Sequence, residues 1–262
     1  LQAIAELLGV PPEDRHLVFE WSNRMIGAED PEYQVAPEAA FEASADLYGY
    51  ANRLGLEKRA NPGDDIVSVL LQAEVDGERL DEMQFDLFFL LLSVAGNETT
   101  RNLISHGMHA LIEHPEQRQR LLDDPSLLPT GIEEMLRWAT PVMSFRRTAT
   151  HDTELAGQPI AEGDKVVIWY ISANRDESVF EEPFRFDVGR SPNDHITFGG
   201  GGPHFCLGSH LAKLEIRIMF EELLRRLPDM ELDGPVRRLR SNFINGLKHM
   251  PVRFTPSPRL AS

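Results

Sequence analysis

Apolar residues three and four positions apart predict that most of the chain is helical. The helices expected in its first half cover residues 13–26, 38–57, 66–73 and 81–114. The last of these contains no proline and is stopped by Pro115, and Asp81 with Gln84 has N-cap and N3 character. Its centre, Leu87 to Ala95, is apolar on every side, so we expect this part to be buried all round.

A second helix start is indicated by Thr130 and Glu133, which have the spacing of a capping box, and this helix is expected to end before Pro141. Further along, the periodicity changes to one typical of strands. Strands are expected over 145–150, 153–155, 165–171, 230–232 and 252–255, with a helix over about 207–226. The predicted fold class is therefore mainly α with small β-sheets (α+β).

The length of 262 residues is sufficient to bury a large core, and we expect a single domain over 1–262. It would comprise a helical core over about 1–140, a small β-region over about 141–194, a loop and helix over 195–227, and strands over 228–262. The chain opens in mid-helix character at Leu1 to Leu8, so we also expect further sequence upstream.

The formal net charge is −16, which argues against nucleic acid as a partner because phosphates are bound by basic surfaces. The longest apolar run, Leu87 to Ala95, is too short to span a bilayer, and no signal peptide is recognisable. We therefore expect no integral membrane segment and a cytoplasmic location. The single cysteine, Cys206, excludes an intrachain disulfide and must be a packed thiol, a ligand or a nucleophile.

Four consecutive glycines precede Cys206, in the segment that runs from Phe198 to Gly208. Glycines allow the backbone to pass close to a flat, bulky group, and the helix expected next should lower the pKa of the thiol through its N-terminal amides. Thiolate is the form that binds iron. The alternatives are a buried free cysteine and a nucleophile with His204 as its base. No Gly-Lys-Ser/Thr follows, which excludes a phosphate-binding P-loop.

Polar residues interrupt the apolar centre of the long helix at Gly96, Glu98 and Thr99. The Thr99 hydroxyl is expected to bond to the Ala95 carbonyl and to open the helix locally. Together these residues would form a groove suited to delivering protons. The alternative is a helix kink that packs a neighbour.

Glu134 and Arg137 are three residues apart, which places them on one helix face as an ion pair. Arg185 is a second arginine that could complete a buried Glu–Arg–Arg cluster. Taken alone, the pair is more often a surface one.

These three motifs, with Ala173-Asn174-Arg175-Asp176, resemble the cytochrome P450 family in their order and separation. The stretches 95–102 and 245–248 are most similar to actinobacterial enzymes that hydroxylate cholesterol and methyl-branched lipids. Phe198 lies eight residues before Cys206, one more than is common in the family, and the extra glycine fits that lipid-oxidising group. The resemblance implies a cytochrome P450 fold that lacks its N-terminal part.

The resemblance also implies the residue roles. Cys206 would be the axial thiolate of haem b, His204 and Arg147 would bind its propionates, and Thr99 with Glu98 would serve dioxygen activation and proton relay. Other residues expected at the haem are Phe198, Gly199, Gly208, Ala95 and Gly96. Glu134, Arg137 and Arg185 would form the structural cluster behind it.

The implied reaction is monooxygenation of a hydrophobic sterol, isoprenoid or branched fatty acid. The substrate pocket expected from its apolar residues comprises Val94, Val142, Met143, Phe145, Phe243 and Ile244. Electrons would come from NAD(P)H through a ferredoxin reductase and a ferredoxin, docked on a basic stripe of Lys213, Arg217, Arg225 and Arg226. The alternatives are a haem-binding protein or inactive fragment without turnover, and a haem-free cysteine enzyme.

Overall fold

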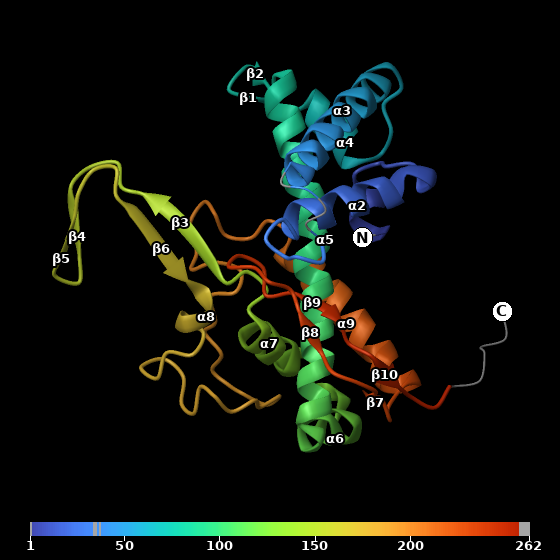
Figure 1. The fold of residues 1–262 in the computed structure, drawn as a ribbon, viewed down its shortest axis with the longest axis vertical. Coiled ribbons are helices and arrows are strands. Elements are labelled where there is room, and N and C mark those ends of the chain that lie inside the picture. The colour runs from blue at the N-terminus through green and yellow to red at the C-terminus, as the bar shows by residue number, and fades with distance from the viewer. Residues whose placement is uncertain (1, 34–35, 37, 257–262) are drawn as a thin grey trace. The chain divides into compact units, whose positions relative to one another are not determined.

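The computed structural model describes residues 2–33, 36 and 38–256 (Figure 1). These residues form two compact units, of which the first comprises Leu1–Arg101 with Leu239–Ser241 and the second comprises Asn102–Arg238 with Asn242–Ser262. The predicted fold class is confirmed, because helices dominate among these residues and each sheet that they form has two strands. The single domain expected over the whole chain stays a prediction. No helix within the described ranges is both long and apolar enough to cross a membrane.

Over its described residues, the regular structure of the first unit is helical apart from one hairpin. Its helices are α1 (Gln2–Leu7), η1 (Pro12–Asp14), α2 (Arg15–Ile26), α3 (Ala39–Ala60), α4 (Ile66–Gln72) and part of α5 (Glu82–Glu113). The strands β1 (Glu74–Val75) and β2 (Glu78–Arg79) pair antiparallel around a turn at Asp76 and Gly77 (Figure 1). The four helices expected from periodicity are therefore present, and each of their ends lies within three residues of the predicted position.

The start of α5 confirms the capping prediction, whereas the burial predicted for its centre is wrong. The Gln84 amide donates to the Asp81 carboxylate at 2.7 Å, and the Asp81 amide donates to the Gln84 side chain at 3.0 Å. Phe85 and Phe89 are buried in the core of the first unit. By contrast Leu87 is 49% exposed and Leu91 is 56% exposed. Because residues four apart share a helix face, α5 has one buried face and one apolar exposed face.

The second unit contains the rest of α5 and most of the strands. Its other helices are α6 (Pro115–Asp123), η2 (Pro125–Leu127), α7 (Leu128–Ala139), α8 (Tyr170–Ala173) and α9 (Ser209–Arg226). Its strands are β3 (Ser144–Thr148), β4 (Thr153–Leu155), β5 (Gln158–Ile160), β6 (Lys165–Trp169), β7 (Glu231–Leu232), β8 (Arg237–Arg238), β9 (Leu247–His249) and β10 (Val252–Arg253). An apolar core joins α5, α6, α7 and α9.

All sheets of the second unit are antiparallel pairs. β3 pairs with β6 over five residues, from Ser144 opposite Trp169 to Thr148 opposite Lys165. The hairpin β4–β5 continues from this ribbon (Figure 1). The strand expected over 165–171 ends at Trp169, because α8 takes the chain on from Tyr170. β7 pairs with β10 and β8 with β9, of which β8 and β9 were not predicted.

The predicted capping box at Thr130 is wrong. α7 begins two residues earlier, at Leu128, with a proline in its first turn, and Leu127 is the residue before it. Proline is well tolerated in a first turn, where its missing N–H would have no helical partner. The Thr130 hydroxyl instead donates to the Leu127 carbonyl at 2.9 Å. Glu133 is therefore free of a capping role.

A buried carboxylate joins α7 to the coil that follows α8. The Glu134 and Arg137 side chains are fully buried, and two hydrogen bonds of 2.7 Å join the guanidinium to both carboxylate oxygens. Arg137 also donates to the carbonyls of Asn174 at 2.9 Å and Pro183 at 2.8 Å. The pair is thus a buried one, and its remaining donors satisfy backbone that would otherwise lack partners.

The second arginine of this cluster is Arg190, and the assignment to Arg185 is wrong. Arg190 Nε donates to Glu134 at 3.1 Å, and Asn193 donates to the same oxygen at 3.1 Å. The Arg185 side chain is 56% exposed and pairs with Glu182 at 2.8 Å. Only its backbone carbonyl reaches the cluster, where it accepts from Arg137 at 3.2 Å. Arg185 and Arg190 lie on the same coil, so their positions in the sequence could not show which of them pairs with Glu134.

His106 of α5 is buried in the second unit. Its Nε2 lies 2.9 Å from the carbonyl oxygen of Asn245, so Nε2 carries the proton. Burial, with the nearby charge of Arg238, lowers the pKa of His106 from 6.5 to about 4. The unfolded chain therefore binds a proton at His106 at a higher pH than the folded chain does.

We expect His106 to make the fold sensitive to acid. Its contribution is fully present above pH 6.5 and is lost as the pH falls towards about 4. At roughly 1.4 kcal/mol for each pH unit, the loss amounts to about 3 kcal/mol. Urea unfolding between pH 7 and pH 4 should show this loss in the parent protein and much less in His106→Gln. The exposed control His151→Gln should keep it, and an equal loss in both variants would contradict the assignment.

We expect Arg190 and Arg185 to differ in their effect on stability. Arg190→Gln removes a hydrogen bond to a buried carboxylate and should lower the free energy of unfolding by about 1.5–3 kcal/mol. Arg185→Gln removes an exposed ion pair and should change it by less than about 1 kcal/mol. Urea unfolding of the two variants measures the difference. A larger loss of stability in Arg185→Gln than in Arg190→Gln would indicate that Arg185 is the second arginine of the cluster.

Candidate functional site

Cys206 lies in a closed loop immediately before α9. Its amide donates to the Phe198 carbonyl at 2.9 Å, which joins the two ends of the glycine segment. The Ser209 amide donates to the Cys206 carbonyl at 3.3 Å, where α9 begins. The thiol is therefore held between the loop and the first turn of the helix.

The glycines of this loop differ in whether the backbone requires them. Gly199, Gly201 and Gly202 have φ of 96°, 96° and 78°, in the left-handed region that other residues rarely adopt. Gly200 and Gly208 have ordinary backbone, and a side chain there would meet nothing within 4 Å. Three glycines are thus required by the backbone of the turn, whereas Gly200 and Gly208 are not required by backbone or by space.

The pKa predicted for the thiol is wrong in direction. Burial raises the pKa of Cys206 above its usual value of 9.0, and the hydrogen bond from the Gly208 amide lowers it by less. The half-buried sulfur loses more hydration than one amide returns. A thiolate at Cys206 therefore requires a positive charge, and a bound metal ion would provide one.

The surroundings of Cys206 fit a flat apolar group that carries a metal. Its neighbours Phe205 and Leu207 are 48% and 81% exposed, so apolar surface flanks the thiol on both sides. Among the described residues, no three His, Cys, Asp or Glu side chains are grouped to hold a metal ion. A metal ion held by Cys206 would therefore take most of its ligands from the group that carries it, as the iron of a haem does.

The two residues expected to bind propionates are separate in the second unit. His204 lies exposed in the glycine loop. Arg147 is exposed on β3, where it donates to the Arg146 carbonyl at 3.1 Å and lies over the Phe145 ring. No hydrogen bond or ion pair between described residues joins Arg147 to His204. Their shared role stays a prediction.

The apolar residues expected around a substrate partly come together. Met143 donates to the Phe243 carbonyl at 2.8 Å, and a β-bridge joins Val142 to Ile244. The rings of Phe145 and Phe243 lie 5.6 Å apart, and both are partly exposed. Two segments about 100 residues apart thus share one apolar surface, although Ile244 is buried and belongs to the core.

In the first unit, Thr99 makes the hydrogen bond predicted for it. Its hydroxyl donates to the Ala95 carbonyl at 2.8 Å, but α5 is continuous here, so the expected local opening is absent from the helix. The groove expected at Gly96 is also wrong. A side chain at Gly96 would lie 2.8 Å from Ile4 of α1, so this glycine allows two helices to pack closely. The exposed side of the motif is at Ala95.

Glu98 has a cationic partner that the sequence analysis missed. The residue is 1% exposed, and its carboxylate accepts from Arg101 at 2.5 Å and from Asn97 at 3.1 Å. Arg101 also donates to Asn23 of α2 at 3.2 Å. Burial raises the pKa of Glu98, and the charge of Arg101 offsets part of this. The three-residue spacing of Glu98 and Arg101 was the available signal.

A second group that was not predicted, Glu133 with His195 and Lys213, packs against the glycine loop at Phe198. Glu133 of α7 accepts from His195 at 3.0 Å and lies 2.7 Å from Lys213 of α9. Lys213 also lies over the Phe198 ring, 5.5 Å from its centre. Burial raises the pKa of Glu133, but the bonds from His195 and Lys213 bring it below its usual value. The assignment of Glu133 to a capping box concealed this role.

Comparison with known proteins agrees with this geometry. The chain is 49% identical over 256 residues to a methyl-branched lipid omega-hydroxylase of Mycobacterium tuberculosis, covering 97% of this chain and 60% of that protein. It is 50% identical over 254 residues to a steroid C26-monooxygenase of Rhodococcus jostii, covering 97% and 53%. A Mycobacterium marinum cytochrome P450 in complex with pseudoionone superimposes with a TM-score of 0.92 at 46% identity, covering 97% and 62%.

The similarity extends to the family level. The chain spans about 60% of the length of the curated relatives that it matches. The family model described as Cytochrome P450 matches residues 42–235, which include Ala95 to Thr99 of α5, the Glu134–Arg137 pair and Cys206. The chain belongs to the cytochrome P450 family.

Proposed function

We propose that the protein containing this chain is a haem-thiolate monooxygenase that hydroxylates a hydrophobic substrate. The observation that carries the proposal is Cys206, held by the Phe198 carbonyl and flanked by exposed apolar side chains. When bound, haem would supply the reductive activation of dioxygen at its iron. Cys206 would hold the iron as thiolate, while Phe205 and Leu207 would pack against the ring and exclude water.

We propose a sterol, isoprenoid or methyl-branched lipid as the substrate. The relatives are named for methyl-branched lipids and for steroids. In this chain, Met143, Phe145 and Phe243 form an apolar surface that could contact a sterol ring or a fatty chain, with Arg147 beside Phe145. The exposed apolar face of α5 at Leu87 and Leu91 offers a second such surface in the first unit.

Thr99 and Glu98 are proposed to hold and move protons. The Thr99 hydroxyl is partly exposed and donates its proton to the Ala95 carbonyl, so its oxygen can still accept a hydrogen bond from a water. Glu98 is buried and bound to Arg101, so it would exchange protons only when that pair separates. Glu98 is also well placed to hold α5 against α2 through Arg101.

A ferredoxin, reduced through its reductase by NAD(P)H, remains the proposed electron donor, and a cytoplasmic location remains the prediction. The basic stripe expected to dock it is neutralised within the chain. Lys213 pairs with Glu133, and Arg217 pairs with Glu221. Arg225 and Arg226 share the partner Glu222. Docking through α9 would therefore depend on shape and on mixed charges more than on a positive field.

The first test is the absorption spectrum of the reduced, carbon-monoxide-bound protein. We expect the red-shifted Soret band of thiolate ligation in the parent protein and its loss in Cys206→Ser. Cys206→His retains a metal ligand without a thiolate, so it should bind haem without the shift. The same red-shifted band in Cys206→Ser would contradict the proposal. Haem without the shift in the parent protein would favour a haem-binding protein that has no turnover.

The second test concerns Thr99. Thr99→Ala removes the hydroxyl, and we expect product formed per NAD(P)H consumed to fall at least about tenfold, with a matching rise in hydrogen peroxide. Thr99→Ser retains the hydroxyl and should keep most of the coupling. Product, NAD(P)H and peroxide are measured in the same reaction. Unchanged coupling in Thr99→Ala would remove Thr99 from proton delivery.

A further inference from the structure

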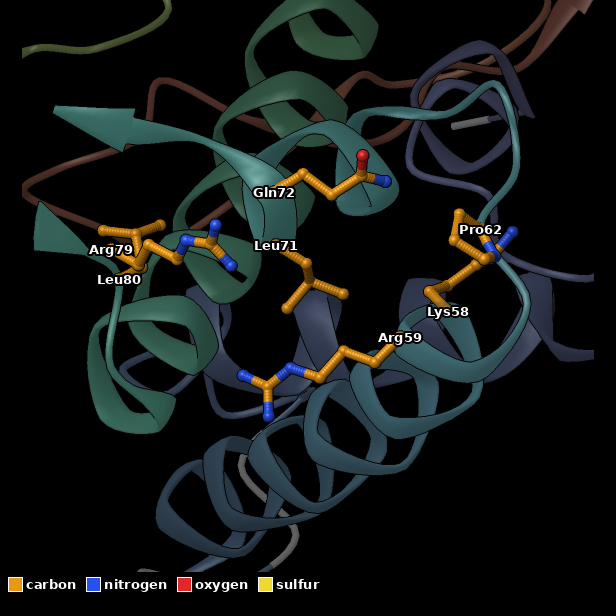
Figure 2. Close-up of a pocket in the computed structure, with 7 residues that line it drawn as sticks. All are labelled: Lys58, Arg59, Pro62, Leu71, Gln72, Arg79 and Leu80. Carbon is orange, nitrogen blue, oxygen red and sulfur yellow. The ribbon is translucent and has the colours of Figure 1, made fainter. Parts of the chain in front are cut away.

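A cavity of about 330 Å³ opens in the first unit, away from the residues discussed above (Figure 2). It lies between the last turn of α3, the end of α4 and the strand β2. Its apolar wall is formed by Pro62, Leu71 and Leu80. This volume is near the lower end of the range of about 300–1,000 Å³ for small-molecule sites.

Three basic side chains line this cavity, although the chain as a whole has a net charge of −16. Lys58 and Arg59 belong to the last turn of α3, where basic residues are favoured by the helix dipole. Arg79 comes from β2, so the dipole does not account for it. Cations from two separate elements thus border the same small space.

The three cations differ in how firmly they are already paired. Lys58 lies 2.5 Å from the largely buried Asp65 and is held by it. Arg79 lies 3.4 Å from Glu74, and both side chains are more than half exposed, so this pair contributes little and can open. No described residue forms an ion pair with Arg59. Two guanidinium groups therefore remain available to a ligand.

The carboxyl group of Asp86 feels the charge of Arg59, but Asp86 is not among the residues that line the cavity. Burial raises the pKa of Asp86 of α5, its neighbour Glu82 raises it further, and the charge of Arg59 lowers it. Figure 2 shows that Arg59 extends from α3 and Arg79 from β2 towards the same side of Leu71. Like charges turned towards one space repel each other unless an anion lies between them.

We propose that this cavity binds a small amphipathic anion, a carboxylate or phosphate monoester with a short apolar tail. Arg59 and Arg79 would hold the oxyanion, because guanidinium groups match its oxygens in pairs. Leu71 and Leu80 would contact the tail, and Gln72 also lines the cavity. The site shares no residue with the Cys206 loop or with the Thr99 motif, so it goes beyond the proposed function.

Calorimetric titration of the intact protein tests the proposal without reference to haem. The probes are hexanoate, hexyl phosphate, inorganic phosphate and hexylammonium, which separate the headgroup from the tail and from the charge. We expect one saturable site for hexanoate or hexyl phosphate, and the tighter of the two identifies the headgroup. Inorganic phosphate should bind more weakly than hexyl phosphate, and hexylammonium should not bind.

Charge-neutralising variants locate the site. Arg59→Gln and Arg79→Gln should each raise the dissociation constant of the better probe by about tenfold, which is typical of one charge-assisted hydrogen bond. Arg253→Gln is the matched control, because Arg253 is 65% exposed and pairs with Glu231 much as Arg79 pairs with Glu74. It should leave binding unchanged.

Three results would overturn the proposal: no saturable binding of either organic anion, inorganic phosphate as tight as hexyl phosphate, or the same affinity in Arg59→Gln as in the parent protein. Because calorimetry needs no bound haem, these results are independent of the spectrum that tests Cys206. Loss of this site would therefore leave the proposed monooxygenase intact, and the reverse also holds.

Discussion

The second unit depends on the full satisfaction of one buried carboxylate. A charge as deeply buried as Glu134 is tolerated only when it is paired and hydrogen-bonded. Arg137 and Arg190 supply the charge, and the Asn193 side chain at 3.1 Å and the Asp187 amide at 3.0 Å are further donors. Arg137 also donates to two backbone carbonyls of the coil after α8, those of Asn174 and Pro183. A long coil without regular structure is thereby fixed to a helix.

Hydrogen bonds connect that coil to the loop of Cys206. The buried Asn174 accepts from the Ile196 amide at 2.9 Å and donates to Thr140 and Thr197, each at 2.9 Å. Two residues after Ile196, the Phe198 carbonyl accepts from the Cys206 amide, and Lys213, paired with Glu133, lies over the Phe198 ring. The thiol is thus positioned by a continuous series of contacts that begins at Glu134, although Glu134 is far from it in the sequence.

Buried charge is used differently in the two units. Glu134 has partners on every side and is purely structural, whereas Glu98 has a half-exposed arginine that can leave. Cys206 has only a backbone amide, so its thiolate lacks compensation from the chain. An incompletely compensated group is costly to the fold and is retained where a ligand or a reaction can use it. The same reasoning applies to Arg59 and Arg79, which are directed at a space that the chain leaves open.

The sequence by itself determined the helices of the first unit, the Asp81–Gln84 cap, the bond from Thr99 to Ala95 and the family of the Cys206 loop, because each depends on residues a few positions apart. Only the tertiary structure chose Arg190 over Arg185, filled the space at Gly96 with Ile4 and exposed one face of α5. It also reversed the expected direction of the Cys206 pKa. Which arginine of a coil pairs with Glu134 depends on where distant segments of the chain pass. The balance between burial and hydrogen bonding at the Cys206 thiol depends on the same paths. Local spacing carries no information about those paths.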